Sequence, residues 1–166
     1  EEKNQAEAEF RYTLTRVREN GESIALLGGE EEERGGIDRN FTIFDDSDQM
    51  ALVRESMESE DVDPKVWKAR DILNLISKAK EQLVLPDQFH KKFVGALENV
   101  TRRVYKVYQA KLLLNNALDF DDLIMYTVLL FQNKPDVLKH YQDKFRYILV
   151  DEYQDINYSQ YTLVRN

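Results

Sequence analysis

An apolar run followed directly by two acidic residues is the feature that most constrains the fold of this 166-residue chain. Residues 147–150 read Tyr-Ile-Leu-Val, and Asp151 and Glu152 follow them. Such a run predicts a buried β-strand over residues 145–150. A strand alone leaves its backbone hydrogen-bonding groups unpaired. We therefore expect its partner strands to lie outside this chain, or the strand to pair weakly with residues 41–44.

The acidic residues at the end of this strand suit chemistry on a nucleotide. At the carboxyl edge of an α/β sheet, Asp151 can face a magnesium ion directly or through water. Glu152 can orient and deprotonate an attacking water, and the amide of Gln154 can sense a terminal phosphate. The plain alternative is a strand that ends at an acidic turn in solvent. Because the sequence contains no Gly-x-x-x-x-Gly-Lys-Ser/Thr loop, we expect only half of a phosphoryl-transfer site.

The composition predicts a domain with a real core and few options for metal binding. Hydrophobic residues make up 42% of the chain and charged residues 33%. No apolar run approaches the roughly 20 residues that span a bilayer, and no signal-peptide pattern is present. Cysteine is absent, which excludes disulfides and thiolate sites, and His90 and His140 lie far apart. We expect a cytoplasmic protein without membrane contact and, since the first residue is Glu, an excised or processed segment.

The net charge of −8 conceals a basic segment. Residues 65–111 contain eleven Lys and Arg residues and only four Asp and Glu residues, a net charge of +7. Such a segment can form a surface that faces nucleic-acid phosphates, although part of it can equally be a solubilising face. Arg102, Arg103 and Lys106 are the residues that we expect to contact DNA phosphates.

Aromatic residues are interspersed with these basic residues. Phe89 and Phe93 lie on an apolar helical stripe, which predicts core positions. Tyr105 and Tyr108 are better candidates for contact with DNA, and we include Tyr105 among the expected DNA-binding residues. Burial remains the simpler interpretation of both tyrosines.

Helical periodicity dominates the remaining sequence. A short extended segment is expected at residues 41–44 and a boundary at the glycine pair 35–36. Asp45 and Asp119 are expected N-caps, and Asp63-Pro64 predicts a further short helical start. The expected helices cover residues 4–19, 45–57, 69–82, 87–115, 119–129, 135–142 and 157–165.

Several blocks, taken in order, resemble the UvrD/PcrA/Rep group of superfamily-one DNA helicases. Their order and spacing along residues 38–165 are close to those of that group, which makes coincidence a weak explanation. The blocks are Arg39-Asn40-Phe41-Thr42-Ile43, Asp46-Ser47-Asp48-Gln49, Asp63-Pro64-Lys65, Leu118 to Ile124, Pro135-Asp136-Val137-Leu138, Tyr141 to Phe145, Val150 to Asn157, and Gln160-Tyr161.

This resemblance implies a mostly α fold: a helical insertion subdomain with one core strand of a RecA-like α/β motor domain. Residues 37–145 would be the helical subdomain called 1B, and residues 146–166 a strand and helix of the incomplete motor domain. Residues 118–124 would pack beside the motor core and help to position the DNA path.

The resemblance also implies roles for the acidic segment. Asp151 would coordinate the metal, Glu152 would be the catalytic base, and Gln154 would couple phosphate state to movement. The intact parent would hydrolyse ATP with Mg²⁺ and act in DNA repair. Because the phosphate loop is missing, neither Mg²⁺ nor ATP is expected to bind this fragment tightly. Its partners would be single-stranded or forked DNA and the remainder of the motor.

The N-terminal residues resemble a different family. Residues 6–33, from Glu7-Ala8-Glu9-Phe10 to Gly28-Gly29-Glu30, are similar to a cytosolic helical segment of ABC exporters of the vitamin B12 and antimicrobial-peptide type. No membrane span accompanies them, so transport by this chain is not expected. We therefore interpret residues 1–36 as a helical segment of different origin, joined near the glycine pair 35–36.

Three functional hypotheses follow from these patterns. The first is a fragment of an ATP-dependent DNA helicase or translocase that is inactive as an ATPase by itself. The second is a non-catalytic helical DNA-binding module. The third is an acidic helical interaction protein without a nucleotide or DNA role.

Overall fold

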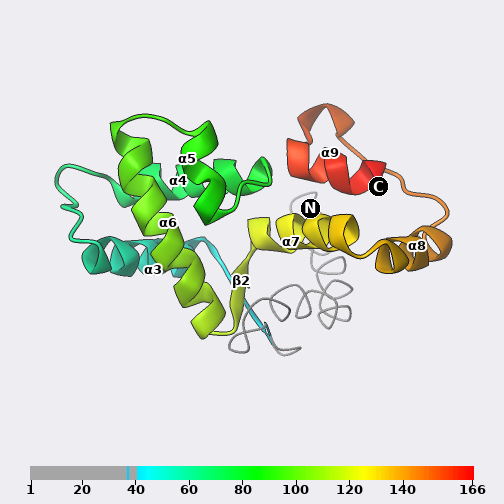
Figure 1. Ribbon diagram of the computed structural model, residues 1–166, viewed down its shortest axis with the longest axis horizontal. Helices are drawn as coiled ribbons and strands as arrows, with labels where there is room; N and C mark the ends of the chain where they lie inside the picture. Colours follow the sequence, from blue (N-terminus) through cyan, green and yellow to red (C-terminus); the bar gives the residue numbers. More distant parts are fainter. Residues whose placement is uncertain (1–36, 38–40) are drawn as a thin grey trace, which may run out of the picture.

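The computed structural model describes residue 37 and residues 41–166 of the chain, and this part is mostly helical (Figure 1). Helices α3 to α6 gather on one side, and α7 leads away from them to α8 and α9. The helices are α3 (Asp46–Ser59), α4 (Ala69–Glu81), α5 (Phe89–Lys92), α6 (Ala96–Leu114), α7 (Phe120–Asn133), α8 (Pro135–Lys144) and α9 (Tyr158–Arg165), with short 3-10 turns η1 (Pro86–Gln88) and η2 (Tyr153–Asp155). The mostly helical fold class is confirmed.

Two short parallel strands connect the beginning and the end of the α3–α6 group. Strand β1 (Thr42–Phe44) pairs with β2 (Ala117–Asp119), so that Thr42 lies opposite Ala117 and Phe44 opposite Asp119. The Thr42 amide also donates a hydrogen bond of 3.0 Å to the carbonyl oxygen of Asn116. The extended segment at residues 41–44 is therefore confirmed, but its partner is β2 and not residues 145–150.

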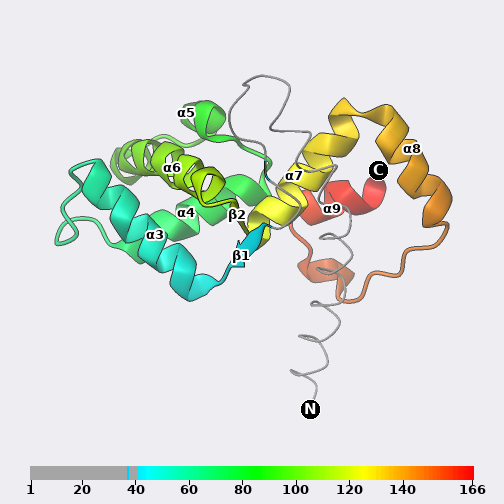
Figure 2. The same cartoon turned by 90° about the horizontal axis from the view of Figure 1, so that it is seen from below.

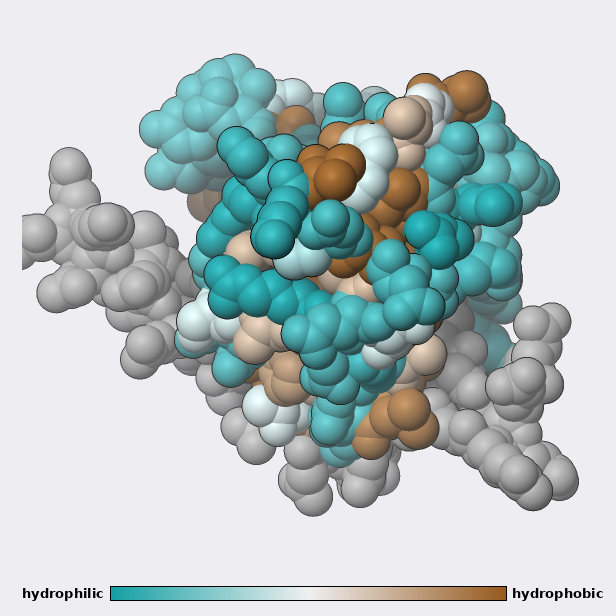
Figure 3. Space-filling model, turned by 90° about the vertical axis from the view of Figure 1, so that its left-hand side faces the viewer, coloured by the Kyte–Doolittle hydropathy of each residue, from teal (hydrophilic) through white to brown (hydrophobic). Residues whose placement is uncertain are grey.

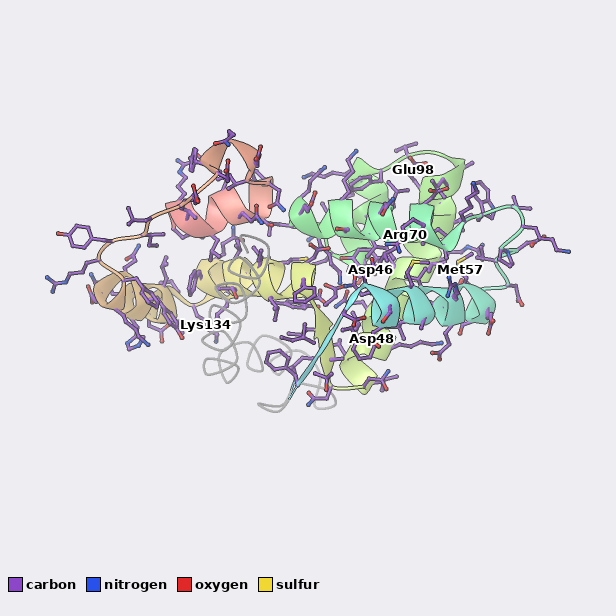
Figure 4. All side chains as sticks on the ribbon, turned by 180° about the vertical axis from the view of Figure 1, so that it is seen from behind. Asp46, Asp48, Met57, Arg70, Glu98 and Lys134 are labelled. Carbon is purple, nitrogen blue, oxygen red and sulfur yellow. The ribbon has the colours of Figure 1, made fainter. Side chains whose placement is uncertain are left out.

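Helices α3, α4 and α6 pack around the main hydrophobic core. Asp45 caps α3 in a reciprocal capping box with Asp48, which satisfies backbone amides of the first turn. The guanidinium of Arg70 on α4 donates hydrogen bonds of 2.6 and 2.8 Å to both carboxylate oxygens of Asp46 on α3 (Figure 4). The predicted apolar stripe of α4 is buried as expected: Ile72, Leu73, Ile76 and Ala79.

The expected helix over residues 87–115 is interrupted. After η1 and α5, the chain is irregular from Phe93 to Gly95, and α6 begins at Ala96. Gly95 has φ of +156° and ψ of 178°, a conformation that side chains with a Cβ rarely adopt, and a Cβ there would collide with the Glu98 carboxylate. The expected helical start at Asp63-Pro64 is likewise only a turn, in which the Asp63 carboxylate accepts a hydrogen bond from the Lys65 amide.

The strand predicted at residues 145–150 is not formed in this chain. The segment runs irregularly around the outside from α8 back towards α9 (Figure 2). Tyr147 is 93% exposed and Leu149 is 99% exposed. The prediction fails because a buried strand needs neighbouring strands for its backbone groups and side chains, and the described part of the chain places none beside it.

Helix α7 lies between the α3–α6 group and the C-terminal elements, which begin with α8. Its N-cap Asp119 forms a capping box with Asp122, as the sequence predicts for the cap. Helix α9, capped by Asn157, packs against both α7 and α4. The C-terminal residues are thus attached to the helical part of the molecule, although residues 147–149 are exposed.

Candidate nucleotide and nucleic-acid sites

The acidic segment lies on the surface after the exposed apolar run. Asp151, Glu152 and Gln154 are all exposed, and Glu152 has a left-handed backbone with φ of 49° and ψ of 41°. The Glu152 amide donates a hydrogen bond of 2.9 Å to the Asp151 carboxylate. The Gln154 amide donates to the Glu152 carboxylate. Asp151 and Gln154 therefore each contact Glu152, but the segment does not lie at the edge of a sheet.

Their oxygen atoms suit Mg²⁺ chemically but form only part of a site. Mg²⁺ is commonly held by one or two carboxylates together with waters and substrate phosphates, and Asp151 and Glu152 supply such carboxylates. Within residues 41–166, however, no three His, Asp or Glu side chains come together as a possible metal site. Further ligands would have to come from the nucleotide, from water or from groups outside the described residues.

The predicted phosphate-binding residues project from the outer surface of α6. Arg102, Arg103 and Lys106 are all exposed. Arg103 lies 3.5 Å from the Glu60 carboxylate and Lys106 lies 2.6 Å from that of Asp87, whereas Arg102 has no ion pair with any described residue. Figure 3 views the molecule from the side of the α3–α6 group, where hydrophilic residues surround a smaller apolar area. The surface is basic but partly neutralised by neighbouring acids.

Tyr105 cannot stack on a nucleic-acid base in this structure. Its side chain is fully buried, its hydroxyl donates a hydrogen bond of 3.1 Å to the Val84 carbonyl oxygen, and its ring lies edge-on to Phe89 at 6.0 Å. Burial raises the pKa of Tyr105 well above its usual value. This burial argues against the DNA-binding prediction for Tyr105, because Tyr105 lies on the inner side of α6. The core prediction for Phe89 is confirmed.

Lys80, which belongs to the basic segment by sequence, is also fully buried. Its ammonium lies 2.5 Å from the Asp119 carboxylate and 2.8 Å from the Asp122 carboxylate. The Tyr108 hydroxyl donates a hydrogen bond of 2.9 Å to Asp119, and the Gln109 amide donates bonds of 3.1 and 3.2 Å to Asp122. We call Lys80, Asp119 and Asp122 the buried ionic cluster.

Burial and charge act in opposite directions within this cluster. Burial by itself lowers the pKa of Lys80, but the carboxylates of Asp119 and Asp122 outweigh it and raise that pKa above its usual value. Burial and the charge of Asp119 raise the pKa of Asp122 to about 7, against the opposing effects of Lys80 and Gln109. The cluster holds two acids and one base, and the raised pKa of Asp122 lets this acid keep its proton while Asp119 balances the Lys80 ammonium.

Sequence reasoning missed this cluster although its acids were visible. Asp119 was expected only as a helix cap, and Lys80 only as one of the basic residues. Three acids, Asp119, Asp121 and Asp122, fall within an otherwise apolar segment, which is a signal for a buried cation. The sequence does not reveal that the cation lies 39 residues earlier.

Comparison with known proteins agrees with the helicase resemblance. Residues 13–166 match the UvrD/REP helicase N-terminal domain, and the chain belongs to this family. Over 133 residues it is 49% identical to the ATP-dependent DNA helicase PcrA of Bacillus subtilis, 46% identical to that of Staphylococcus epidermidis and 45% identical to that of Staphylococcus aureus. Each alignment covers 80% of this chain and 18% of the relative, so the chain spans less than a fifth of these helicases.

The N-terminal resemblance to exporters remains a prediction. Residues 6–33 lie outside the described residues, and the helicase family match already includes residues from position 13. Among the described helices, none combines the length and the apolar character needed to cross a bilayer.

Replacing Lys80 with Met should strongly destabilise the protein. The Lys80→Met variant keeps the side-chain length but leaves Asp119 and Asp122 buried without their ammonium, which costs roughly 3–5 kcal/mol when a buried ion pair is broken. Urea unfolding followed by circular dichroism measures the change. Lys78→Met, at an exposed position of the same helix, should have little effect. Equal stabilities of the two variants would contradict this account of the cluster.

Asp122 should make stability depend on pH between about 4 and 7. In this window the unfolded chain has released the Asp122 proton, whose ordinary pKa is 3.8, whereas the folded chain retains it. The folded state then binds more protons, so the contribution of Asp122 to stability falls as the pH rises. The Tm of Asp122→Asn relative to the original protein should therefore increase from pH 4 to pH 7. The Asp136→Asn variant, altered at an exposed position of α8, is the control. This assignment would be refuted if the Tm difference between Asp122→Asn and the original protein did not change with pH, or if it changed as it does for the control.

Proposed function

We propose that this chain is a segment of an ATP-dependent DNA helicase or translocase, in which it supplies an acidic nucleotide-site segment and a helical surface for DNA. The observation that carries the proposal is the family match over residues 13–166 together with 49% identity to a PcrA helicase. In this proposal residues 37–145 form the 1B-like helical subdomain, and residues 146–166 belong to the motor domain. The parent protein acts in the cytoplasm.

The acidic segment performs nucleotide chemistry only within the complete motor. Mg²⁺, when bound with ATP, supplies positive charge that stabilises the phosphoryl groups during transfer. Asp151 would hold the hydrated metal, Glu152 would accept a proton from the attacking water, and Gln154 would respond to the terminal phosphate. The exposure of Tyr147 and Leu149 supports this proposal, because a neighbouring sheet would bury them and would place the acids at its edge.

The DNA-facing part of the proposal rests on α6. Arg102, Arg103 and Lys106 project from one exposed surface, where phosphate contacts would replace the present contacts to Glu60 and Asp87. Single-stranded or forked DNA is the proposed ligand. A non-catalytic DNA-binding module is the alternative that uses the same surface, and DNA binding in the absence of any ATP-dependent activity of the parent would favour it. An acidic interaction protein would show neither activity.

The chain by itself should have negligible ATPase activity. It lacks a Gly-x-x-x-x-Gly-Lys-Ser/Thr loop, and its acidic segment lies in solvent rather than at a sheet edge. Phosphate release with Mg²⁺ and ATP, measured with and without single-stranded DNA, should be the same for the chain and for Glu152→Gln. Turnover well above that of Glu152→Gln would show that the chain forms a more complete site than we propose.

DNA binding should depend on the basic surface of α6 and on salt. Fluorescence anisotropy with single-stranded and forked DNA should give an association constant that falls as the salt concentration rises. On single strands, the logarithm of this constant should fall against the logarithm of the salt concentration with a slope of about 0.7 per phosphate contact. The Arg102/Arg103/Lys106 triple alanine variant should bind more weakly and show a smaller slope. A triple alanine variant at Lys139, Lys144 and Arg146 changes the net charge equally and should retain most of the affinity. Equal losses in both variants would indicate a non-specific charge effect.

A further inference from the structure

The two hydrophobic clusters of the structure meet at β2 and the start of α7. Ala117 of β2 belongs to the main core among α3, α4 and α6, whereas Leu118 belongs to a second, smaller cluster. The next residue, Asp119, belongs to neither and contacts Lys80. The other buried members of the second cluster are Ile37, Phe41 and Leu123. Buried charged groups therefore follow directly after the point in the chain where one cluster gives way to the other.

Each acid at the beginning of α7 is held by a different set of donors. Asp119 accepts from Lys80 on α4 and from Tyr108 on α6. Asp122 contacts Lys80 and accepts from Gln109 on α6. Asp121 accepts a hydrogen bond of 2.6 Å from Ser77, one turn before Lys80 on α4. The first turn of α7 is thus attached to both α4 and α6 through polar groups.

Such contacts restrict orientation more strongly than apolar packing does. Hydrogen bonds and ion pairs weaken steeply when their atoms leave a narrow range of distance and angle, whereas apolar burial is non-directional. A buried acid that loses its partner also incurs a desolvation cost, so a rotation of α7 is penalised at several atoms together. Buried ionic groups can therefore specify one arrangement even where they add little net stability.

We propose that the buried ionic cluster is an orientation lock, which sets the direction of α7 relative to the α3–α6 group. Helix α7 is followed by α8, by the acidic segment at residues 151–155 and by α9, so the lock determines where these elements lie (Figures 1 and 2). If the proposed function holds, the lock also maintains the acidic segment at a defined position relative to the basic surface of α6. That consequence rests on the proposed function, whereas the lock itself does not.

Packing by α9 is the competing explanation for the same geometry. Helix α9 contacts both α7 and α4, and it could hold the two helices together without the ionic cluster. The two explanations differ when the charges are removed while the helix caps and the packing are kept. The variant Lys80→Met/Asp119→Asn/Asp122→Asn does this, because Asn remains a good N-cap and Met fills the space of the Lys stem.

Distances between spin labels test the proposal directly. The chain contains no cysteine, so introduced cysteines give specific labelling. The pair Ala110→Cys and Gln132→Cys spans the junction from α6 to α7, and the pair Glu58→Cys and Ala110→Cys lies within the α3–α6 group; all three positions are exposed. Pulsed electron spin resonance on the full chain, without DNA or nucleotide, should give a single narrow distance distribution for both pairs when the lock is intact.

In the charge-free variant, the distribution of the junction pair should broaden or shift while that of the pair within the group stays unchanged. Unchanged distributions for both pairs would overturn the proposal in favour of packing by α9, and equal broadening of both would indicate general loosening instead. If the charge-free variant does not fold, Asp119→Asn decides the question, because it removes one charge of the cluster while keeping a good N-cap for α7. Its junction distribution should broaden, and a distribution like that of the original chain would reject the lock. Failure of the DNA-binding or ATPase experiments would leave this result unaffected.

Discussion

The contact of Lys80 with Asp119 and Asp122 is the interaction on which the arrangement of the helices depends. It joins the last turn of α4 to the first turn of α7, and Tyr108 and Gln109 add α6 to the same contact. The charges are fully buried, so their desolvation is offset only while all the partners stay in place. Hydrophobic burial accounts for the compactness of α3, α4 and α6, whereas the buried charges determine how α7 leaves them.

Residues 147–149 show the opposite situation, in which a sequence typical of a β-strand has no neighbouring strand to pair with. Tyr147, Ile148 and Leu149 have the composition of a buried strand, yet all three are exposed. A strand is stabilised by its neighbours in a sheet, and the described strands of this chain pair only with each other. Under the proposed function, this segment would gain neighbouring strands from the remainder of the motor, and its exposed apolar side chains would then be buried.

Features that depend on local chemistry could be predicted from the sequence, and those that depend on distant contacts could not. The caps at Asp45 and Asp119 and the apolar stripe of α4 follow from residues three or four positions apart, and the structure contains them. The break at Gly95 was missed because a single glycine within a long helical repeat of apolar residues is a weak local signal. Tyr105 was assigned to DNA because its neighbours are basic, although its own position on α6 faces the core.

By itself, the sequence determined the helical character of the chain and the order of its acidic and basic segments, because both follow from residue spacing. It also determined the helicase family, through the similarity of its motif blocks to those of known members. Only the tertiary structure decided which charged residues are available to a ligand. It leaves Arg102, Arg103 and Lys106 in solvent and buries Lys80, which the same basic segment contains. The physical reason is that the environment of a charge depends on groups brought together by folding, and the acids that neutralise Lys80 lie 39 and 42 positions further along the chain.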